Sequence, residues 1–431
     1  MTRPVLLFLL VAALYAGTGV LQSWNLALTI LNMGLLSAIM ALGVNMQWGY
    51  AGLFNTGVMG FLALGGLAPV LIATQPNPGA FAAGGGRLIA ALVFGGLAIA
   101  AAVQIWRRMA RGTARVASLL AVLVAGFFIY RWLFDPAVAA IEAVNPTFGG
   151  NLGGLGLPVW LAWPVGGLLA AAFAWGVGKV ALGLRSDYLA IATLGMAEIV
   201  VAVLKNEDWL ARGVKNVTGI PRPVPYEIDL QNSPDFVARA TGWGLDPVTA
   251  STLTVKLSYT GIFLAVLLGL VLLLELALKS PWGRMMRAIR DNEIAAEAMG
   301  KDVKRRHLQI FVLGSAVIGL AGAMMTTLDG QLTPTTYNPL RYTFLIWVMV
   351  IVGGSGSNWG AVLGGLLIWF CWVQVEPLGQ LIIQGVTWGM AEGSWLRAHL
   401  QDSAQHMRLM TMGIILLLVL RFSPRGLIPE K

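Results

Sequence analysis

Long apolar runs dominate this sequence. Stretches almost free of charge recur at 5–22, 26–46, 51–74, 88–106, 116–134, 159–182, 188–204, 259–278, 308–328, 343–354, 361–376 and 407–421. A helix that crosses the hydrocarbon core of a bilayer needs about 20 such residues. Only 11% of the residues are charged, whereas a soluble domain carries about 25%. We therefore predict an all-α polytopic membrane protein with roughly ten to twelve transmembrane helices.

The polar segments between these runs suggest how the chain is organised. We expect one transmembrane domain over 1–431, with 84–158 as an inserted two-span hairpin and 205–257 as a large extracytoplasmic loop. Within that loop, the prolines of "PRPVPYEIDLQNSPDF" (221–236) are expected to exclude a regular helix. The runs 343–354 and 361–376 are short and are separated by "GGSGSNWG". They are predicted to be broken or re-entrant helices.

The distribution of Lys and Arg predicts the orientation in the membrane. If the N-terminus is inside, eighteen of the 29 basic residues fall on the inner side of the membrane. They lie in the first few residues, in 107–115, 179–185 and 279–307, and in the C-terminal tail. Cytoplasmic loops carry such an excess. Both termini are therefore predicted to be cytoplasmic. The net charge of +9 follows from the same pattern, so no nucleic-acid partner is expected.

One short segment holds a concentration of charge. "GRMMRAIRDNEIAAEAMGKDVKRR" (283–306) contains eleven of the chain's 29 basic and 20 acidic residues. Pro281 can open a helix, no helix breaker lies between Arg284 and Met299, and Gly300 is a natural stop. We predict a cytoplasmic helix over 284–300, within a cytoplasmic loop at 279–307, whose small residues let another surface approach closely. An ordinary solvated loop is the alternative.

This segment resembles the cytoplasmic loop of bacterial ABC importer permeases, and it is most similar to that of the LivM-type permease subunits of branched-chain amino-acid importers. Further stretches carry the same resemblance, namely "LRSDYLAIATLGMAEIV" (184–200), "IVGGSGSNWGAVLGG" (351–365), "RFSPRGLIPE" (421–430) and, more loosely, "GVNMQWGYAGLFNTG" (43–57).

The resemblance implies a multi-pass permease of the bacterial inner membrane. Its partners would be a second, LivH-like permease, two cytoplasmic ATPase subunits and an extracytoplasmic substrate-binding protein. The sequence has no G-x-x-x-x-G-K-[ST] phosphate loop, so we expect no enzyme activity and no cofactor in this chain, with ATP used by the partner subunits. The resemblance also implies that the helix over 284–300 is a coupling helix, which is seated in a groove of the ATPase. It would contact the ATPase through Arg287, Arg290, Asp291, Glu293 and Glu297, with Ala296 and Gly300 permitting close approach.

The substrate path is less clearly marked. Broken membrane helices offer backbone groups to a zwitterionic amino acid, and Gly195, Gly353, Gly354 and Gly356 are candidate break points. Glu198 lies inside an apolar run, where a carboxylate is costly. It is a candidate pathway residue, with a structural hydrogen bond to a neighbouring helix as the alternative. Thr193, about one turn earlier, can bond backbone or substrate.

Two other functions are alternatives, and a third is disfavoured. A urea or short-amide importer would share the same machinery with another cargo. An ion-coupled secondary transporter would show several ionisable residues near the membrane midplane, and Glu198 is the clear case. An intramembrane enzyme is disfavoured because the three histidines fall in or beside loops, without a catalytic pair or metal motif.

Overall fold

The computed structural model describes residues 3–145, 150–184, 186–388, 390, 394–403 and 406–430. Within them, nine helices are long and apolar enough to cross a membrane, and two shorter apolar helices, Val58–Ala73 and Leu340–Gly353, accompany them. The strands described are β1 (Val217–Thr218) and β2 (Gln331–Leu332), which pair antiparallel. The prediction of an all-α polytopic membrane protein is confirmed.

The long helices are α1 (Arg3–Leu21), α2 (Trp24–Ala51), α5 (Gly86–Arg108), α6 (Thr113–Ala143), α7 (Ala162–Ala181), α8 (Ser186–Asn206), α12 (Pro247–Lys279), α15 (Val303–Asp329) and α17 (Asn358–Thr387). The shorter ones are α3 (Val58–Ala73), α4 (Pro78–Ala80), α9 (Asp208–Ala211), α10 (Glu227–Gln231), α11 (Pro234–Gly242), α13 (Pro281–Asp291), α14 (Glu293–Ala298), α16 (Leu345–Gly353), α18 (Trp395–Ser403) and α19 (Met407–Phe422).

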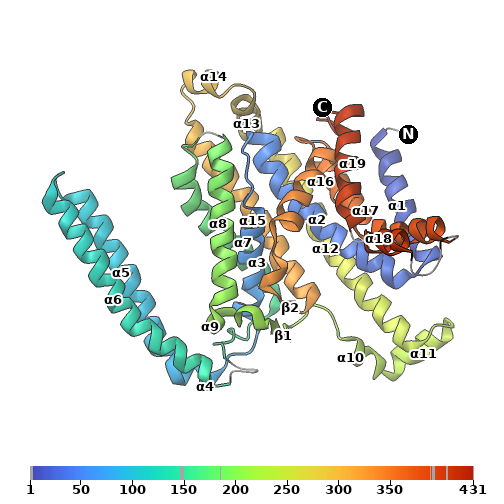
Figure 1. Cartoon of the computed structure of the whole chain (residues 1–431), viewed down its shortest axis with the longest axis horizontal. Coiled ribbons are helices and arrows are strands. Elements are labelled where there is room, and N and C mark those ends of the chain that lie inside the picture. Colours follow the sequence, from blue (N-terminus) through green and yellow to red (C-terminus); the bar gives the residue numbers. More distant parts are fainter. Residues whose placement is uncertain are drawn as a thin grey trace.

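Helices α2, α3, α7 and α15 form the centre of the bundle, and α12, α16 and α17 pack around α2 (Figure 1). Glycine allows this close packing. A Cβ on Gly65 of α3 would overlap the carbonyl oxygen of Gly319 on α15, and one on Gly319 would meet Gly166 of α7. In lipid, no hydrophobic driving force brings helices together. Small residues at the crossings let the helix backbones approach closely, so that van der Waals packing holds the helices together.

Helices α5 and α6 form a hairpin that extends away from this bundle (Figure 1). Its base has a small core of its own, in which Leu88, Phe134 and Ile141 pack against Trp209 of α9. Most of its length is exposed and apolar, as expected of helices surrounded by lipid. That the segment 84–158 is an insertion stays a prediction.

Several helix boundaries differ from the sequence prediction. Helix α12 begins at Pro247, twelve residues before the predicted apolar run at 259, because Asp246 caps it by accepting the backbone N–H of Thr249 at 3.1 Å. The stretch 221–236 contains α10 and the start of α11, so the expectation that its prolines exclude a regular helix was wrong. Pro234 sits at the start of α11, where a proline is tolerated.

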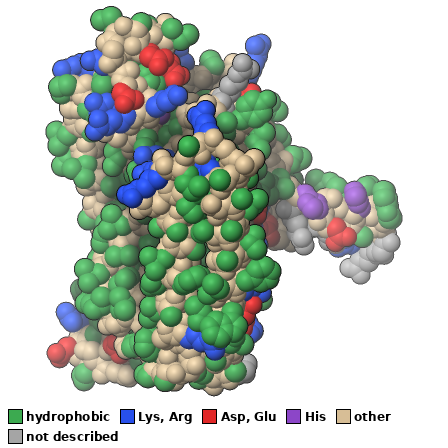
Figure 2. Space-filling view, turned by 90° about the vertical axis from the view of Figure 1, so that its left-hand side faces the viewer, with side chains coloured by type: hydrophobic (Ala, Val, Ile, Leu, Met, Phe, Trp, Pro, Cys, Tyr) green, Lys and Arg blue, Asp and Glu red, His purple; other side chains and the backbone are tan. Residues whose placement is uncertain are grey.

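Both termini and the segment α13–α14 lie on one side of the molecule, while α10, α11 and the β1–β2 pair lie on the other (Figure 1). Figure 2 shows charged side chains toward the upper and lower ends of one face, with hydrophobic side chains between them. This is the distribution expected when the middle of the bundle lies in lipid and its two ends lie in water.

Candidate functional site

Helix α13 is the first half of the charged segment and is anchored to the bundle. Ser280 caps it, and Pro281 occupies its first turn, the position predicted for this proline. Met286 and Ile289 are buried, and α13 packs against α2 and α12. The exposed face carries Arg284. This amphipathic helix is therefore fixed to the ends of two long helices.

The single helix predicted over 284–300 is broken at Asn292. This residue has an extended backbone (φ −156°, ψ 96°), and its side chain accepts the N–H of Ala295 at 2.9 Å. Asparagine competes for backbone donors in this way and starts a new helix, a local signal that the prediction overlooked. The segment is therefore two helices, α13 and α14. Gly300 has φ +76° and stops α14, as predicted.

Helix α14 presents an apolar tip to solvent. Ile294 is 81% exposed and Met299 is 80% exposed. Ala296 is buried, and α14 packs against α15. The expectation that Ala296 lets a partner approach closely was therefore wrong, because its own chain already occupies that space.

The charged residues predicted to contact the ATPase divide into two groups. Asp291, Glu293 and Glu297 are exposed, as is Gly300, and stay candidates for partner contacts. Arg287 and Arg290 are half-buried. The two groups therefore face different surroundings.

Arg290 bonds inside its own chain. Its Nη1 donates to Glu430 Oε2 at 2.7 Å and to the backbone oxygen of Gly49, and its Nε lies 3.2 Å from Asp291 Oδ1. Burial alone would lower the pKa of Arg290, but the hydrogen bonds and charges of Glu430 and Asp291 outweigh it and raise the pKa. The guanidinium thus ties α13 to the end of α2 and to the C-terminal tail.

The C-terminal tail is threaded beside the glycine turn between α16 and α17. Leu427 N–H donates to Val352 O and Ile428 N–H donates to Gly353 O, both at 2.9 Å. Gly354 has φ +121° and Gly356 has φ +83°, so this turn requires glycine. The predicted break in the helix at 353–356 is confirmed, and it lies at the same end of the bundle as α13.

A line of polar groups continues from this turn into the bundle. Gly356 N–H donates to Asn45 Oδ1 at 2.8 Å, and Tyr50 bonds through its hydroxyl to Asn358 Oδ1. Asn358 Nδ2 in turn donates to Glu275 Oε1 of α12 at 3.0 Å. We call this set the Arg290 cluster; its members are Asn45, Gly49, Tyr50, Glu275, Arg290, Gly356, Asn358 and Glu430.

Sequence reasoning found Arg290 and Gly356 but missed the other members. Glu430 belongs to the tail motif "RFSPRGLIPE", and Asn45, Gly49 and Tyr50 belong to "GVNMQWGYAGLFNTG". The signal was the presence of polar residues in both motifs. Their contact with Arg290 was not visible in the sequence.

The residues predicted on α8 point in opposite directions. Thr193 is buried, and its Oγ1 accepts the backbone N–H of Thr56 at 3.2 Å. Gly195 and Glu198 are on the exposed side of the helix. The expected break at Gly195 was wrong, because α8 runs without interruption from Ser186 to Asn206.

The loop between α2 and α3 is held by buried polar side chains. Gln47 Nε2 donates to Phe311 O at 2.9 Å, and Asn55 Nδ2 donates to Gln47 Oε1 at 2.7 Å. Trp347 Nε1 donates to Asn55 O at 2.9 Å. Thr193 joins this network through Thr56, so its position is explained by packing.

Among the residues that the structure describes, no three or more His, Cys, Asp or Glu side chains are grouped as metal ligands.

Similarity to known proteins agrees with these features. The family described as "Branched-chain amino acid transport system / permease component" matches residues 26–420. The chain is 26% identical to the probable branched-chain amino acid transport permease protein LivM of Methanocaldococcus jannaschii, over 91% of this chain and 90% of the relative.

Two further relatives match over shorter lengths. The high-affinity branched-chain amino acid transport system permease protein LivM of Escherichia coli is 32% identical over 49% of this chain and 50% of the relative, so that match spans about half of each protein. The ribose import permease protein RbsC of Haemophilus influenzae is 24% identical over 59% of this chain and 73% of the relative. No solved structure matches the chain. The extent of the family match shows that this multi-pass membrane protein belongs to the family of permease components of branched-chain amino acid transport systems.

Proposed function

We propose that the chain is one of two permease subunits of an ATP-driven importer for branched-chain amino acids in the bacterial inner membrane. A second related permease completes the path, two cytoplasmic ATPase subunits use the ATP, and an extracytoplasmic binding protein delivers the substrate. This chain itself has no ATPase activity.

The observation that carries the proposal is the construction of α13–α14. An apolar tip formed by Ile294 and Met299 projects from a segment whose other half is fixed to α2 by Arg290. Exposed apolar residues rimmed by charge are typical of protein contacts. A partner that moves this tip would also move the ends of α2 and α12, which is how a packed interface transmits a change of arrangement.

Helix α8 supports a path between the two permeases. Glu198 is exposed on a helix of membrane-spanning length. A carboxylate at this level faces a water-filled path or another protein chain, because contact with lipid is too costly. We propose that Glu198 and Gly195 line this path together with the second permease. Gly353, Gly354 and Gly356 would instead act at the end of the bundle that holds α13, outside the path.

The test is ATP-dependent uptake of radiolabelled leucine into vesicles that hold the chain with its neighbouring permease, ATPases and binding protein. Ile294→Asp places a charge at the apolar tip and should reduce uptake by about tenfold, equivalent to about 1.4 kcal/mol of lost contact. Ile228→Asp is the matched control, since Ile228 is 67% exposed on α10 at the other end of the molecule. Uptake by this control should equal that of the wild type.

Other cargoes are measured in the same vesicles. Uptake of urea or ribose in place of leucine would keep the importer and change the substrate class. Uptake driven by an ion gradient without the ATPases would refute the proposal, as would normal leucine uptake by a well-folded Ile294→Asp variant.

A further inference from the structure

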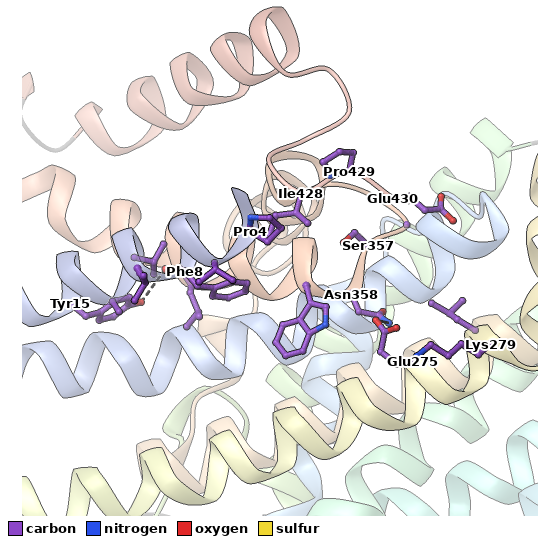
Figure 3. Close-up of a pocket in the computed structure, with 18 of the residues that line it drawn as sticks. Pro4, Phe8, Tyr15, Glu275, Lys279, Ser357, Asn358, Ile428, Pro429 and Glu430 are labelled. Carbon is purple, nitrogen blue, oxygen red and sulfur yellow. Dashed lines mark hydrogen bonds between the residues drawn. The ribbon is translucent and has the colours of Figure 1, made fainter. Parts of the chain in front are cut away.

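A large cavity lies beside the Arg290 cluster, between α1, α2, α12, α17 and the C-terminal tail (Figure 3). Its volume is 1120 Å³, at or above the upper end of the range of roughly 300–1,000 Å³ found for small-molecule pockets. A single amino acid would leave most of it empty. The size therefore fits a larger occupant.

The cavity is apolar at one end and charged at the other. Figure 3 places Tyr15 and Phe8 on one side and Glu275, Lys279 and Glu430 on the other. Phe8 packs edge-on against Trp359, with ring centroids 5.9 Å apart, and forms part of the apolar wall. An occupant that matches both ends is an amphiphile.

The length of the apolar part matches one leaflet of a bilayer. Lining residues of α1 run from Pro4 to Tyr15, which is about 16 Å along a helix that rises 1.5 Å per residue. Half of a hydrocarbon core of about 30 Å is about 15 Å. Val5 and Leu9 on this wall are 47% and 51% exposed, so the cavity is open on the side of α1. An acyl chain can enter from the surrounding membrane.

The charged end carries both signs. Lys279 is exposed, and Arg287 donates a long 3.4 Å hydrogen bond to Leu278 O. Two carboxylates, Glu275 and Glu430, line the same end. Glu275 lies one turn before Lys279 on α12, and the hydrogen bonds described above engage one oxygen of each carboxylate. The cations suit a phosphate, whereas the carboxylates suit an ammonium group.

We propose that this cavity binds one phospholipid with a phosphoethanolamine head group. Its phosphate lies between Lys279 and Arg287, its ammonium group donates to Glu275 and Glu430, and an acyl chain runs along α1 toward Tyr15. Arg290 and Asn358 each engage one carboxylate oxygen, and an anionic head group without the ammonium has no donor for the second oxygen of Glu275 and Glu430. A choline head group has no N–H to donate to them. The assignment to the cytoplasmic leaflet rests on the proposed function, which places α13 on that side.

The experiment measures lipid retained by the delipidated importer complex. The complex is incubated in detergent with equal amounts of phosphatidylethanolamine, phosphatidylcholine and phosphatidylglycerol, and retained lipid is counted by native mass spectrometry. Ala12→Trp fills the apolar part and should lower retention by about tenfold, the effect of losing roughly two buried methylene groups. Ala13→Trp, on the same helix but outside the cavity lining, is the matched control.

The head group is tested separately. Lys279→Gln should lower phosphatidylethanolamine retention, while Lys179→Gln, in the last turn of α7, should leave it unchanged. Equal or preferred retention of phosphatidylglycerol or phosphatidylcholine would overturn the assignment. So would equal retention by Ala12→Trp and its control, or cross-linking of the cavity to a helix of the second permease. Leucine uptake is measured independently of lipid retention. A complex that takes up leucine but retains no phosphatidylethanolamine refutes only the lipid site. A complex that retains lipid but takes up no leucine refutes only the proposed function.

Discussion

Arg290 joins three parts of the chain that are distant in sequence: helix α13, the end of α2 at Gly49, and the tail at Glu430. The Arg290 and Glu430 side chains are 24% and 28% exposed. Their ion pair is therefore intermediate between a surface pair and a buried one. The guanidinium also donates a hydrogen bond to the backbone oxygen of Gly49, which a carboxylate cannot do.

This geometry predicts an asymmetric mutant cycle. Arg290→Gln should destabilise the protein by about 2 kcal/mol, between the values for exposed and buried pairs, and Glu430→Gln should cost less because Gly49 O keeps its donor. The double variant should cost less than the sum of the two. Thermal unfolding in detergent measures all three. Arg284→Gln, an exposed change on the same helix, is the control, and additive single effects would contradict the proposed pair.

Glu198 should act in transport without stabilising this subunit, because its side chain is on the exposed face of α8. Glu198→Gln removes the charge and keeps the size. We expect leucine uptake to fall by about tenfold, because the variant loses a hydrogen bond to a charged group, worth about 1.5 kcal/mol or more. The thermal stability of the isolated chain should not change. Uptake is measured in vesicles. Loss of stability with normal uptake would instead favour a structural hydrogen bond.

At the scale of elements, the division of the charged segment into α13 and α14 separates two tasks. Helix α13 is fixed to the bundle, and α14 carries the exposed tip. The break depends on Asn292, whose side chain caps α14.

Removing this cap should loosen α14 alone. Asn292→Ala is expected to cost about 1 kcal/mol of local helix stability. Hydrogen exchange at the Ala295 amide should then be about fivefold faster, whereas amides in the middle of α13 should not change. Asn292→Asp retains an acceptor and should restore protection. Equal protection in the alanine variant would show that packing against α15 fixes α14 without the cap.

At the scale of the molecule, the bundle has two ends of different character. One end holds both termini, α13–α14 and the Arg290 cluster, and the other holds α10, α11 and the β1–β2 pair (Figure 1). The distribution of Lys and Arg predicts that the first end is cytoplasmic.

Single cysteines test this orientation. Met299 is 80% exposed at one end and Ile228 is 67% exposed at the other. Both variants also carry Cys371→Ala. We expect a membrane-impermeant maleimide that reaches only the periplasmic side to label Ile228→Cys. The same reagent should label Met299→Cys only after the inner membrane is permeabilised. Arg111→Cys, between α5 and α6, should behave like Met299→Cys. Labelling of Met299→Cys before permeabilisation would reverse the orientation.

The sequence by itself determined the features that depend on local composition. Apolar runs predicted the membrane helices, Pro281 and Gly300 marked where the charged segment starts and stops, and the glycines at 353–356 marked a broken helix. These succeed because the solubility of a run in lipid and the backbone freedom of proline and glycine are properties of a few adjacent residues.

Only the tertiary structure decided which residues meet. Helix packing decides whether Glu198 is on the exposed face of α8, whether Ala296 is buried, and whether Arg290 binds a partner or its own tail. Gly49 and Glu430 are 241 and 140 residues from Arg290 along the chain. Contacts of this kind depend on close backbone approaches such as that of Gly49 to Gly356, and no local pattern encodes them.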